Sequence, residues 1–597
     1  MFQTKLTLLT ALCIATWFTV LSGWSQVAVQ FKDFSALGLD RSGKRSVLKG
    51  SDARQATNGM LEVINARVDL FKADNSIDLT IETPQCFYLR TTKLAWSPSE
   101  LTVKTGDGRF SLQGSGFSWQ QNDSSLVVSN HVRAIIQRNA LSTDLLGGVK
   151  SGGTTSVSEP IHVTSGRLEY VGENVVFRDQ VRVKDGNSSL SCEVLRLHLG
   201  QGDTRLKKVE AESKVVIQQG ETKASGGRGS YDLADGRLRL EDAVTWQLKE
   251  RSGRSDWVQI NRTNNTVLAG GTVHMVLPMT SFMNGQNTNV ALTQSSLEIS
   301  SKNFEYRQNP QLSNSFTAVF TGKVNARESR ASLTGEKLTI EFLGTNQLSR
   351  VLVEQKIELL RGQDRITGDK AVYQLAQDQV TVTGDPVWQF QETQGRAQSL
   401  KYNTRTRGIH AETNVEVDIP TSGEFTAHLL PTTSGKKPAP KTVSSVAKVT
   451  ADQFYFLDHV GTFDQRVQVT DTNGVLNCGQ LQFITGSSNQ LQRLQASGGI
   501  VLKQADTIAT GQLAIYTATN GVLTLSGSPK IVTKEQQITA AEFRINRARG
   551  TFEAKAPYEV QVSKERMKST PVRSQSTEKT SVPKVGLDVF SPIQSRQ

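Results

Sequence analysis

The side chains that most often perform catalysis or bind metals are scattered along this sequence. Its seven histidines stand singly at positions 131, 162, 198, 274, 410, 428 and 459, and none belongs to a His-Glu-x-x-His motif. Neither a Gly-x-Ser-x-Gly elbow nor a phosphate-binding loop is present, and no pair of carboxylates is singled out as an acid and a base. The sequence therefore predicts a protein that is not an enzyme and uses no metal or cofactor.

The cysteines and two conspicuous aspartates have structural interpretations. Apart from Cys13, the thiols are Cys86, Cys192 and Cys478, an odd and widely spaced set that does not form a disulfide framework. Asp242 and Asp385 each follow a β pattern and are interpreted as turn residues.

The residues that do recur with regular spacing are apolar. Three series repeat at steps of 143 residues: Phe177, Phe320 and Phe463; Val181, Val324 and Val467; Leu195, Leu338 and Leu481. Such a constant step predicts one large structural unit repeated along the chain.

The elements that position these residues are predicted to be β-strands. Between 168 and 246, apolar and polar residues alternate with the period of two that places one set on each face of a sheet. Tyr231, Tyr373 and Tyr516 each open a strand that turns and returns. With 48 Gly against 15 Pro, the composition also suits strands and tight turns, so we expect an all-β fold.

The repeats divide the chain into predicted modules at 27–145, 159–280, 297–425 and 446–562. The first matches the others only in its last hairpin. Residues 563–597 carry seven Lys or Arg and three Asp or Glu among many Ser, Thr and Pro, a composition that predicts a disordered basic tail.

Residues 1–25 have the pattern of an export segment. An apolar run from Leu6 to Leu21 follows one early positive charge, which predicts either a cleaved signal peptide or a retained N-terminal anchor.

The net charge of +12 favours anionic partners. The basic residues are spread along the predicted strands without an aromatic ladder beside them, so nucleic acid is not the expected partner.

The repeated hairpins resemble the OstA-like modules of lipopolysaccharide transport, the family of the periplasmic proteins LptA and LptC and of the N-terminal part of LptD. The likeness rests on hairpins such as 224–240 and 510–527, and the 114–119 and 126–132 stretches make the N-terminal module most similar to LptC. It covers nearly everything from about 30 to 562, in more modules than family members usually carry.

This resemblance implies tandem β-jellyroll (β-taco) modules stacked into an elongated, partly open array. It also implies a periplasmic carrier or bridge that shields the acyl chains of lipid A and pairs its strand edges with Lpt-type proteins at the inner and outer membranes. The residues expected to line the lipid groove are Phe177, Val181, Leu195, Leu197, Leu238, Leu240, Phe320, Val324, Leu338, Ile340, Phe463, Val467, Leu481 and Phe483.

Two other interpretations remain open at this stage. The same residues could form the closed core of a structural or adhesive envelope protein that binds nothing. A glycan-cleaving β-helix would show coils of about 20–25 residues, and the 143-residue step does not favour it.

Overall fold

The structure is a computed structural model. It describes residues 29–562 except 42, 56–58, 138–158, 201–202, 249, 279–295, 310–314, 330, 344–346, 391–392, 422–444, 472–473, 487–490 and 547–550. The predicted signal peptide or anchor at 1–25 and the predicted tail at 563–597 lie outside the described residues.

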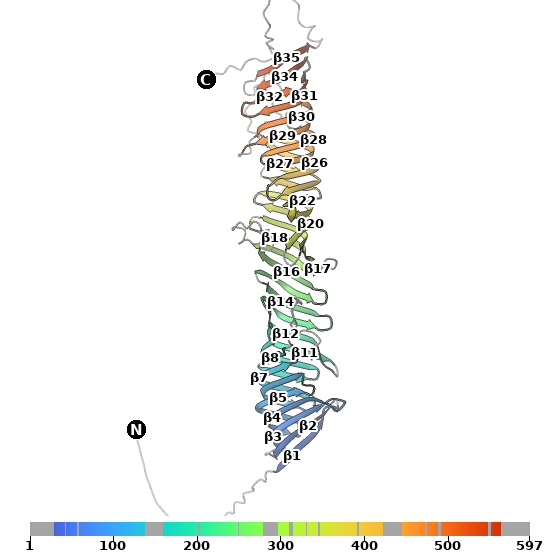
Figure 1. The fold of residues 1–597 in the computed structure, drawn as a ribbon, viewed down its shortest axis with the longest axis vertical. Helices are drawn as coiled ribbons and strands as arrows, with labels where there is room; N and C mark the ends of the chain where they lie inside the picture. Colours follow the sequence, from blue (N-terminus) through green and yellow to red (C-terminus); the bar gives the residue numbers. More distant parts are fainter. Residues whose placement is uncertain are drawn as a thin grey trace, which may run out of the picture. The chain divides into compact units, whose positions relative to one another are not determined.

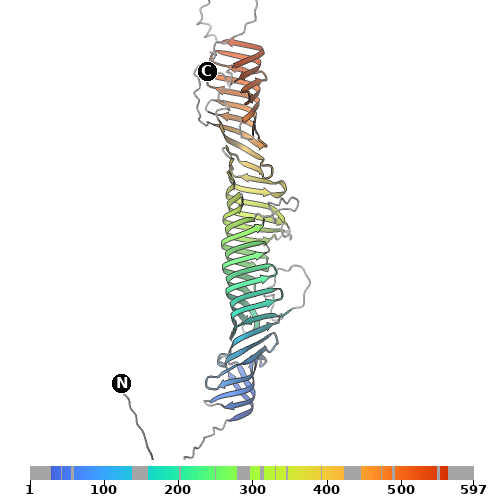
Figure 2. The same ribbon diagram turned by 90° about the vertical axis from the view of Figure 1, so that its left-hand side faces the viewer.

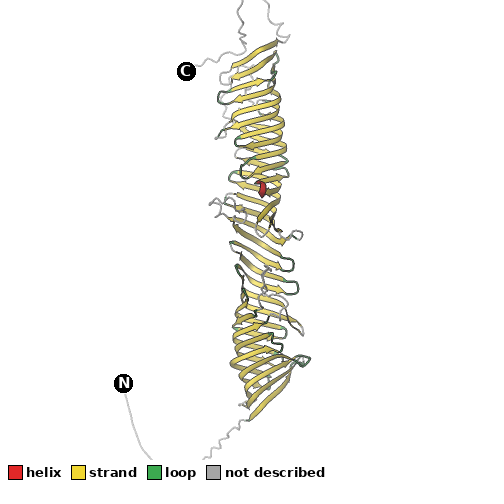
Figure 3. Ribbon diagram, viewed as in Figure 1, coloured by secondary structure: helices red, strands yellow, loops and turns green. Residues whose placement is uncertain are grey.

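Almost every described residue belongs to a β-strand (Figure 3), which confirms the predicted all-β fold. One 3-10 turn, η5 (Leu375–Gln377), interrupts the strands. The chain separates into two compact units, and the division between Ala211 and Glu212 falls within β12 (Asp203–Gln219). The four module ranges given by the sequence stay a prediction.

Unit 1, the described residues up to Ala211, is built from strands that follow one another in chain order (Figure 1). They are β1 (Gln30–Leu39), β2 (Arg45–Gln55), β3 (Met60–Phe71), β4 (Ile77–Leu89), β5 (Leu94–Thr105), β6 (Phe110–Gln120), β7 (Ser125–Ile136), β8 (Ile161–Ser165), β9 (Arg167–Val171), β10 (Asn174–Asp185) and β11 (Ser188–Gly200).

Unit 2, the described residues from Glu212 onward, repeats the same antiparallel arrangement, and Figure 2 shows its strands as successive layers from green to red. Its strands are β13 (Thr222–Asp232), β14 (Arg237–Leu248), β15 (Arg251–Asn261), β16 (Thr266–Pro278), β17 (Ser296–Gln308), β18 (Ser315–Glu328), β19 (Ala331–Leu343), β20 (Gln347–Arg361), β21 (Asp364–Gln374), β22 (Gln379–Thr383), β23 (Val387–Phe390), β24 (Thr393–Arg396), β25 (Ser399–Asn403), β26 (Ile409–Thr421), β27 (Ser445–Leu457), β28 (Val460–Thr470), β29 (Val475–Thr485), β30 (Leu491–Gln504), β31 (Thr507–Thr517), β32 (Val522–Ser526), β33 (Lys530–Val532), β34 (Gln536–Asn546) and β35 (Thr551–Val562).

Many strands are bent near their middle by a bulge. On β10 the register passes from Arg178 opposite Val194 to Val181 opposite Cys192, so two residues face one on the partner strand. Those two residues, Asp179 and Gln180, have φ values of 68° and 54°. Bulges of this kind sharpen the local bend of a strand. The register shifts in the same way at Thr321/Val324 on β18 and at Asp464/Val467 on β28.

The core of each unit forms because apolar side chains alternate along the strands. In unit 2, one cluster of buried residues extends from Ala269 on β16 to Ile545 on β34. Aromatic rings reach across to glycines within it: Trp388 lies over Gly395 and Phe483 over Gly461, where a Cβ atom would meet the ring at 2.2 and 2.1 Å. Glycine is therefore required at these strand positions because only hydrogen fits under the ring.

Candidate functional site

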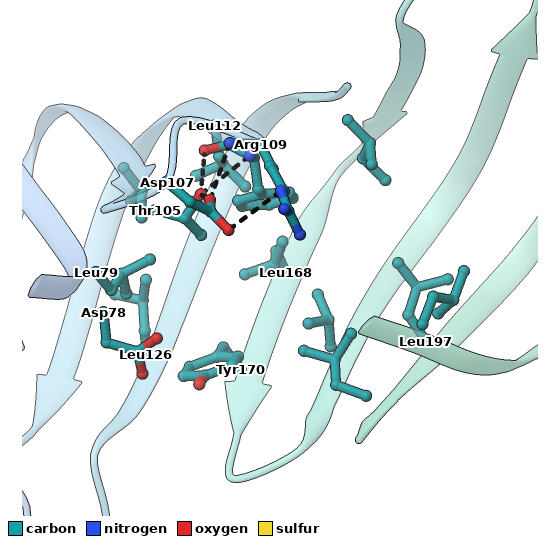
Figure 4. Close-up of a pocket in the computed structure, with 16 residues that line it drawn as sticks. Asp78, Leu79, Thr105, Asp107, Arg109, Leu112, Leu126, Leu168, Tyr170 and Leu197 are labelled. Carbon is teal, nitrogen blue, oxygen red and sulfur yellow. Dashed lines mark hydrogen bonds and ion pairs between the residues drawn. The ribbon is translucent and has the colours of Figure 1, made fainter. Parts of the chain in front are cut away.

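Unit 1 contains an open cavity of about 110 Å³ between its strands (Figure 4). Apolar side chains make most of its walls. Apart from the Tyr170 hydroxyl, the polar lining groups come from the start of β4 and from the turn between β5 and β6. The lining residues are Asp78, Leu79, Val103, Thr105, Asp107, Arg109, Phe110, Leu112, Leu126, Ile136, Leu168, Tyr170, Val175, Leu197, Leu199 and Leu206.

Strand register places the apolar wall residues side by side. Leu126 on β7 lies opposite Tyr170 on β9, Tyr170 lies opposite Val175 on β10, and Val175 lies opposite Leu197 on β11. Directly opposed residues on neighbouring antiparallel strands have their side chains on the same face of the sheet. One continuous apolar row therefore crosses four strands and forms one side of the cavity.

A turn between β5 and β6 supplies the polar part of the lining. The Thr105 hydroxyl donates to Asp107 Oδ1 at 2.6 Å, the Arg109 backbone N–H donates to the same oxygen at 3.0 Å, and Arg109 Nε lies 3.6 Å from Asp107 Oδ2. Burial disfavours the charged carboxylate, but these hydrogen bonds and the charges of Arg109 and Lys72 outweigh it, so the pKa of Asp107 lies below its usual value. Asp107 is thus a fixed negative charge that holds the turn.

Tyr170 is the polar group of the opposite wall. Burial, with the negative charge of Asp78 added to it, raises the pKa of the Tyr170 phenol to about 12. The phenol is therefore neutral at physiological pH, and its ring extends the apolar surface beside Leu126 and Leu168 (Figure 4).

The composition and size of this cavity suit hydrocarbon. An apolar cavity of about 150 Å³ in a protein interior stays dry and binds a molecule the size of benzene. The unit 1 cavity is of that order, and it is open to solvent. A single group such as the end of an alkyl chain could therefore enter without displacing well-bound water.

The structure places the residues predicted to line a lipid groove inside the strand layers. All of them are buried except Leu238, which is half-buried. The members of the series face one another across strands: Phe320 lies opposite Leu338, and Phe463 lies opposite Leu481. Of the whole predicted set, Leu197 lines the unit 1 cavity. Contact of these residues with lipid stays a prediction.

The sequence reasoning missed most of the cavity wall. Val103 and Leu112 were not singled out, because the N-terminal region repeats the later modules only in its last hairpin. Leu168 and Tyr170 lie in the 159–280 module but belong to none of the series that repeat at steps of 143 residues. A signal was available: in β5 and β6 the apolar residues alternate with polar ones, and Val103 and Leu112 lie opposite each other.

The described interior of unit 2 contains a smaller cavity than that of unit 1. A cavity between β29 and β34 has a volume of about 30 Å³ and is lined by residues such as Leu476, Leu494, Ile500 and Tyr516. Nearby, the Phe454 and Phe463 rings stack with their centroids 4.5 Å apart. Whether the strands of unit 2 enclose a lipid groove stays a prediction.

The aspartates and cysteines that the sequence analysis considered lie at bends of the backbone or in the core. Asp242 has a φ of 66° at a bulge and accepts a 2.7 Å hydrogen bond from Arg228 Nε, and Asp385 has a φ of 51° in the turn before Pro386. Cys86 and Cys478 are buried thiols, and burial raises the pKa of each to about 12.

Within the described ranges, no group of three or more His, Cys, Asp or Glu side chains is arranged to hold a metal ion. No helix among the described residues is long and apolar enough to span a membrane.

Comparison with known proteins gave one family. The model described as "LptA/(LptD N-terminal domain) LPS transport protein" matches residues 162–273, 298–424 and 448–551, which together make up more than half of the chain. Among solved structures, the chain is similar to LptH, described as the LptA homologous periplasmic component of the lipopolysaccharide transport device from Pseudomonas aeruginosa. The two are 16% identical, the match covers 20% of this chain and 94% of that one, and the TM-score is 0.18. No curated protein sequence matches the chain.

Proposed function

The chain belongs to the LptA/(LptD N-terminal domain) family of LPS transport proteins, and on this premise we propose that it carries lipopolysaccharide through the periplasm. The acyl chains would be shielded from water among the β-strands while the sugars stay in solvent. The protein would act by binding alone, without catalysis.

The observation that carries this proposal is the open apolar cavity of unit 1. Leu126, Tyr170, Val175 and Leu197 provide a continuous apolar wall, and the neighbouring Asp107 and Arg109 provide a polar boundary. Transfer of each methylene group from water to such a wall is favourable by about 0.8 kcal/mol. An acyl chain would therefore gain enough from even partial burial to enter the cavity.

Passage of acyl chains along unit 2 would require its two walls to separate. The series at Phe320, Leu338, Phe463 and Leu481 lies in the tightly packed interior, where these side chains are at most 2% exposed. In this proposal, lipid replaces the contacts between opposing walls, because hydrocarbon and buried side chains offer similar apolar surroundings.

The strand edges are the proposed contacts with transport partners. Among the described residues, β1 pairs with β2 and β35 pairs with β34, so each of these two strands presents a second edge. On β35, Tyr558, Val560 and Val562 are 51%, 42% and 42% exposed although they lie in register with the partly buried β34. A strand of another Lpt-type protein would extend the sheet and cover this apolar row.

A second function is favoured by the interior packing of unit 2. If its walls never separate, the chain is a structural envelope protein whose core binds nothing. The closely packed rings of Phe454, Phe463 and Phe483 support that alternative.

Photocrosslinking separates the two functions. A photoreactive residue at position 197 should capture the acyl part of lipopolysaccharide in cells, whereas one at position 196, on the opposite face of the same strand, should not. Positions 338 and 481 test unit 2 in the same way. Capture at 197, 338 and 481 supports a carrier along both units, and absence of lipid at all three supports the closed structural protein.

A further inference from the structure

Unit 2 has a second hollow, of about 530 Å³, that differs in character from the cavity of unit 1. It lies over β13, β14, β15 and β16, and most of its lining side chains are polar or positively charged. They are Lys223, Ser225, Thr245, Trp246, Gln247, Ser252, Gly253, Arg254 and His274.

Strand register gathers these side chains on one face. Ser225 lies opposite Thr245, Thr245 opposite Arg254, and Arg254 opposite His274, which makes one polar row across four strands. A second row, one side-chain step away, joins Lys223, Gln247 and Ser252. Rows on one face are about 7 Å apart and strands about 4.8 Å apart, so both rows surround a space small enough for one ligand group.

The chain neighbours of the row residues lie on the core face of the sheet. Trp246, which also borders the hollow, follows Thr245 in the chain, packs against the hydrophobic core of unit 2, and has its ring over Gly253. Val244 and Ser255, opposite each other on β14 and β15, are 1% and 4% exposed. The polar rows therefore belong to the face that is turned away from the core.

The two strong cations of the hollow lack a carboxylate partner. In the described part of the chain, neither Lys223 nor Arg254 forms an ion pair, although other basic residues on these strands do. Arg228 is paired with Asp242 at 2.7 Å and Arg239 with Glu241 at 2.7 Å. The nearest carboxylate contact in the polar rows is that of Glu298 with His274, at 3.8 Å.

The hydroxyl groups of Ser225 and Thr245 add a hydrogen-bond donor beside the two positive charges. Ser225 Oγ and Thr245 Oγ1 are 2.7 Å apart, so one hydroxyl donates to the other. The second hydroxyl keeps its hydrogen for an external acceptor. Two cations and a hydroxyl donor around one concave space match the three acceptor oxygens of a phosphate group.

We infer that the hollow formed by Lys223, Ser225, Thr245, Arg254 and His274 binds a phosphate group on the outer face of unit 2. The ligand is either a phosphorylated sugar or free inorganic phosphate, since both present the same oxygens. Lys223 and Arg254 supply charge from two strands, and the Ser225–Thr245 pair orients the group. The hollow lies on the outer face of unit 2, and the inference does not rest on the proposed carrier function.

The inference is tested with water-soluble ligands and the purified full chain. ³¹P NMR titration with glucose 1-phosphate and with inorganic phosphate measures binding without any acyl chain, and glucose is the neutral control. The Lys223→Gln/Arg254→Gln variant should bind at least about tenfold more weakly, because each lost charge-assisted hydrogen bond is expected to cost that much. The Arg182→Gln/Lys184→Gln variant removes the same charge from exposed positions of β10 and should bind like the native protein.

The outcomes divide clearly. Tighter binding of glucose 1-phosphate than of inorganic phosphate assigns the site to a phosphorylated sugar, and equal binding assigns it to the phosphate group alone. Equal weakening in both double variants, or no weakening in either, overturns the inference. The Thr245→Val variant, which removes the hydroxyl without changing charge, should weaken binding severalfold and provides a second measurement if the charge variant does not fold.

Discussion

Phe177 on β10 lies directly opposite Leu195 on β11, and the two side chains are 0% and 1% exposed. The same pair recurs in unit 2 as Phe320 opposite Leu338. It recurs again as Phe463 opposite Leu481. The 143-residue step in the sequence is therefore a repeated cross-strand contact in the core, whichever ligand the interior accepts.

The first prediction concerns the energy of that contact. Phe177→Ala should lower the local free energy of opening of β10 and β11 by about 3–5 kcal/mol, because a large buried ring is lost and a cavity is left. Hydrogen exchange of peptides from 174–200 measures this locally, which matters because a chain of two units need not unfold in one step. Leu37→Ala, at a side chain that is 67% exposed, should change the opening free energy of its own strand by no more than about 0.5 kcal/mol.

The second prediction tests the unit 1 cavity. Leu199→Trp should fill free space at a half-buried position of the cavity and reduce lipid capture at position 197 about tenfold or more. Leu248→Trp adds the same bulk at a side chain of unit 2 that is 42% exposed, and capture should be unchanged. Undiminished capture in the Leu199 variant would mean that acyl chains use another route.

A third prediction follows from the lowered pKa of Asp107. A carboxyl group whose pKa is lower in the folded than in the unfolded state adds stability above its unfolded pKa, and this stability disappears as the pH falls through the folded pKa. At pH 7, Asp107→Asn should therefore speed hydrogen exchange in 103–112, and the difference from the native chain should vanish in acid, below the usual carboxyl pKa of 3.8. Asp123→Asn, at an exposed carboxylate outside this turn, is the control and should leave hydrogen exchange in 103–112 unchanged.

The fourth prediction concerns glycine under an aromatic ring. A Cβ atom at Gly395 would lie 2.2 Å from Trp388 Cζ2, and Trp388 is 1% exposed. Gly395→Ala should therefore destabilise β23 and β24 by about 1–3 kcal/mol. In the double variant Gly395→Ala/Trp388→Leu the ring is gone, so the clash with the new Cβ atom is relieved. The loss of stability in the double variant should therefore be smaller than the sum of the losses in the two single variants. Full additivity would show that the ring and the glycine do not interact.

The fifth prediction addresses the free edge of β35. Tyr558→Lys/Val560→Lys should weaken association with a purified single-module member of the same family at least about tenfold, because charged side chains on an edge strand oppose further pairing. The control is Ile508→Lys on β31, which has strands on both sides and a side chain that is 38% exposed. Unaltered association of the β35 variant in a pull-down would place the contact elsewhere.

The sequence by itself determined the all-β fold, the repeat and the identity of many core residues. These features are local: the alternation of period two sets which side chains share a face, and a constant step copies that face along the chain. Phe177, Leu195 and their counterparts were identified in this way, and all of them are buried.

Only the tertiary structure decided where the interior is open and which charges are unpaired. The wall of Leu126, Tyr170, Val175 and Leu197 comes from four strands, and Lys223 and Arg254 come from strands separated by β14. Free space and ion pairing depend on the register and packing of several strands at once. Alternation along any single strand does not specify them, because the same apolar pattern serves a filled core as well as an open one.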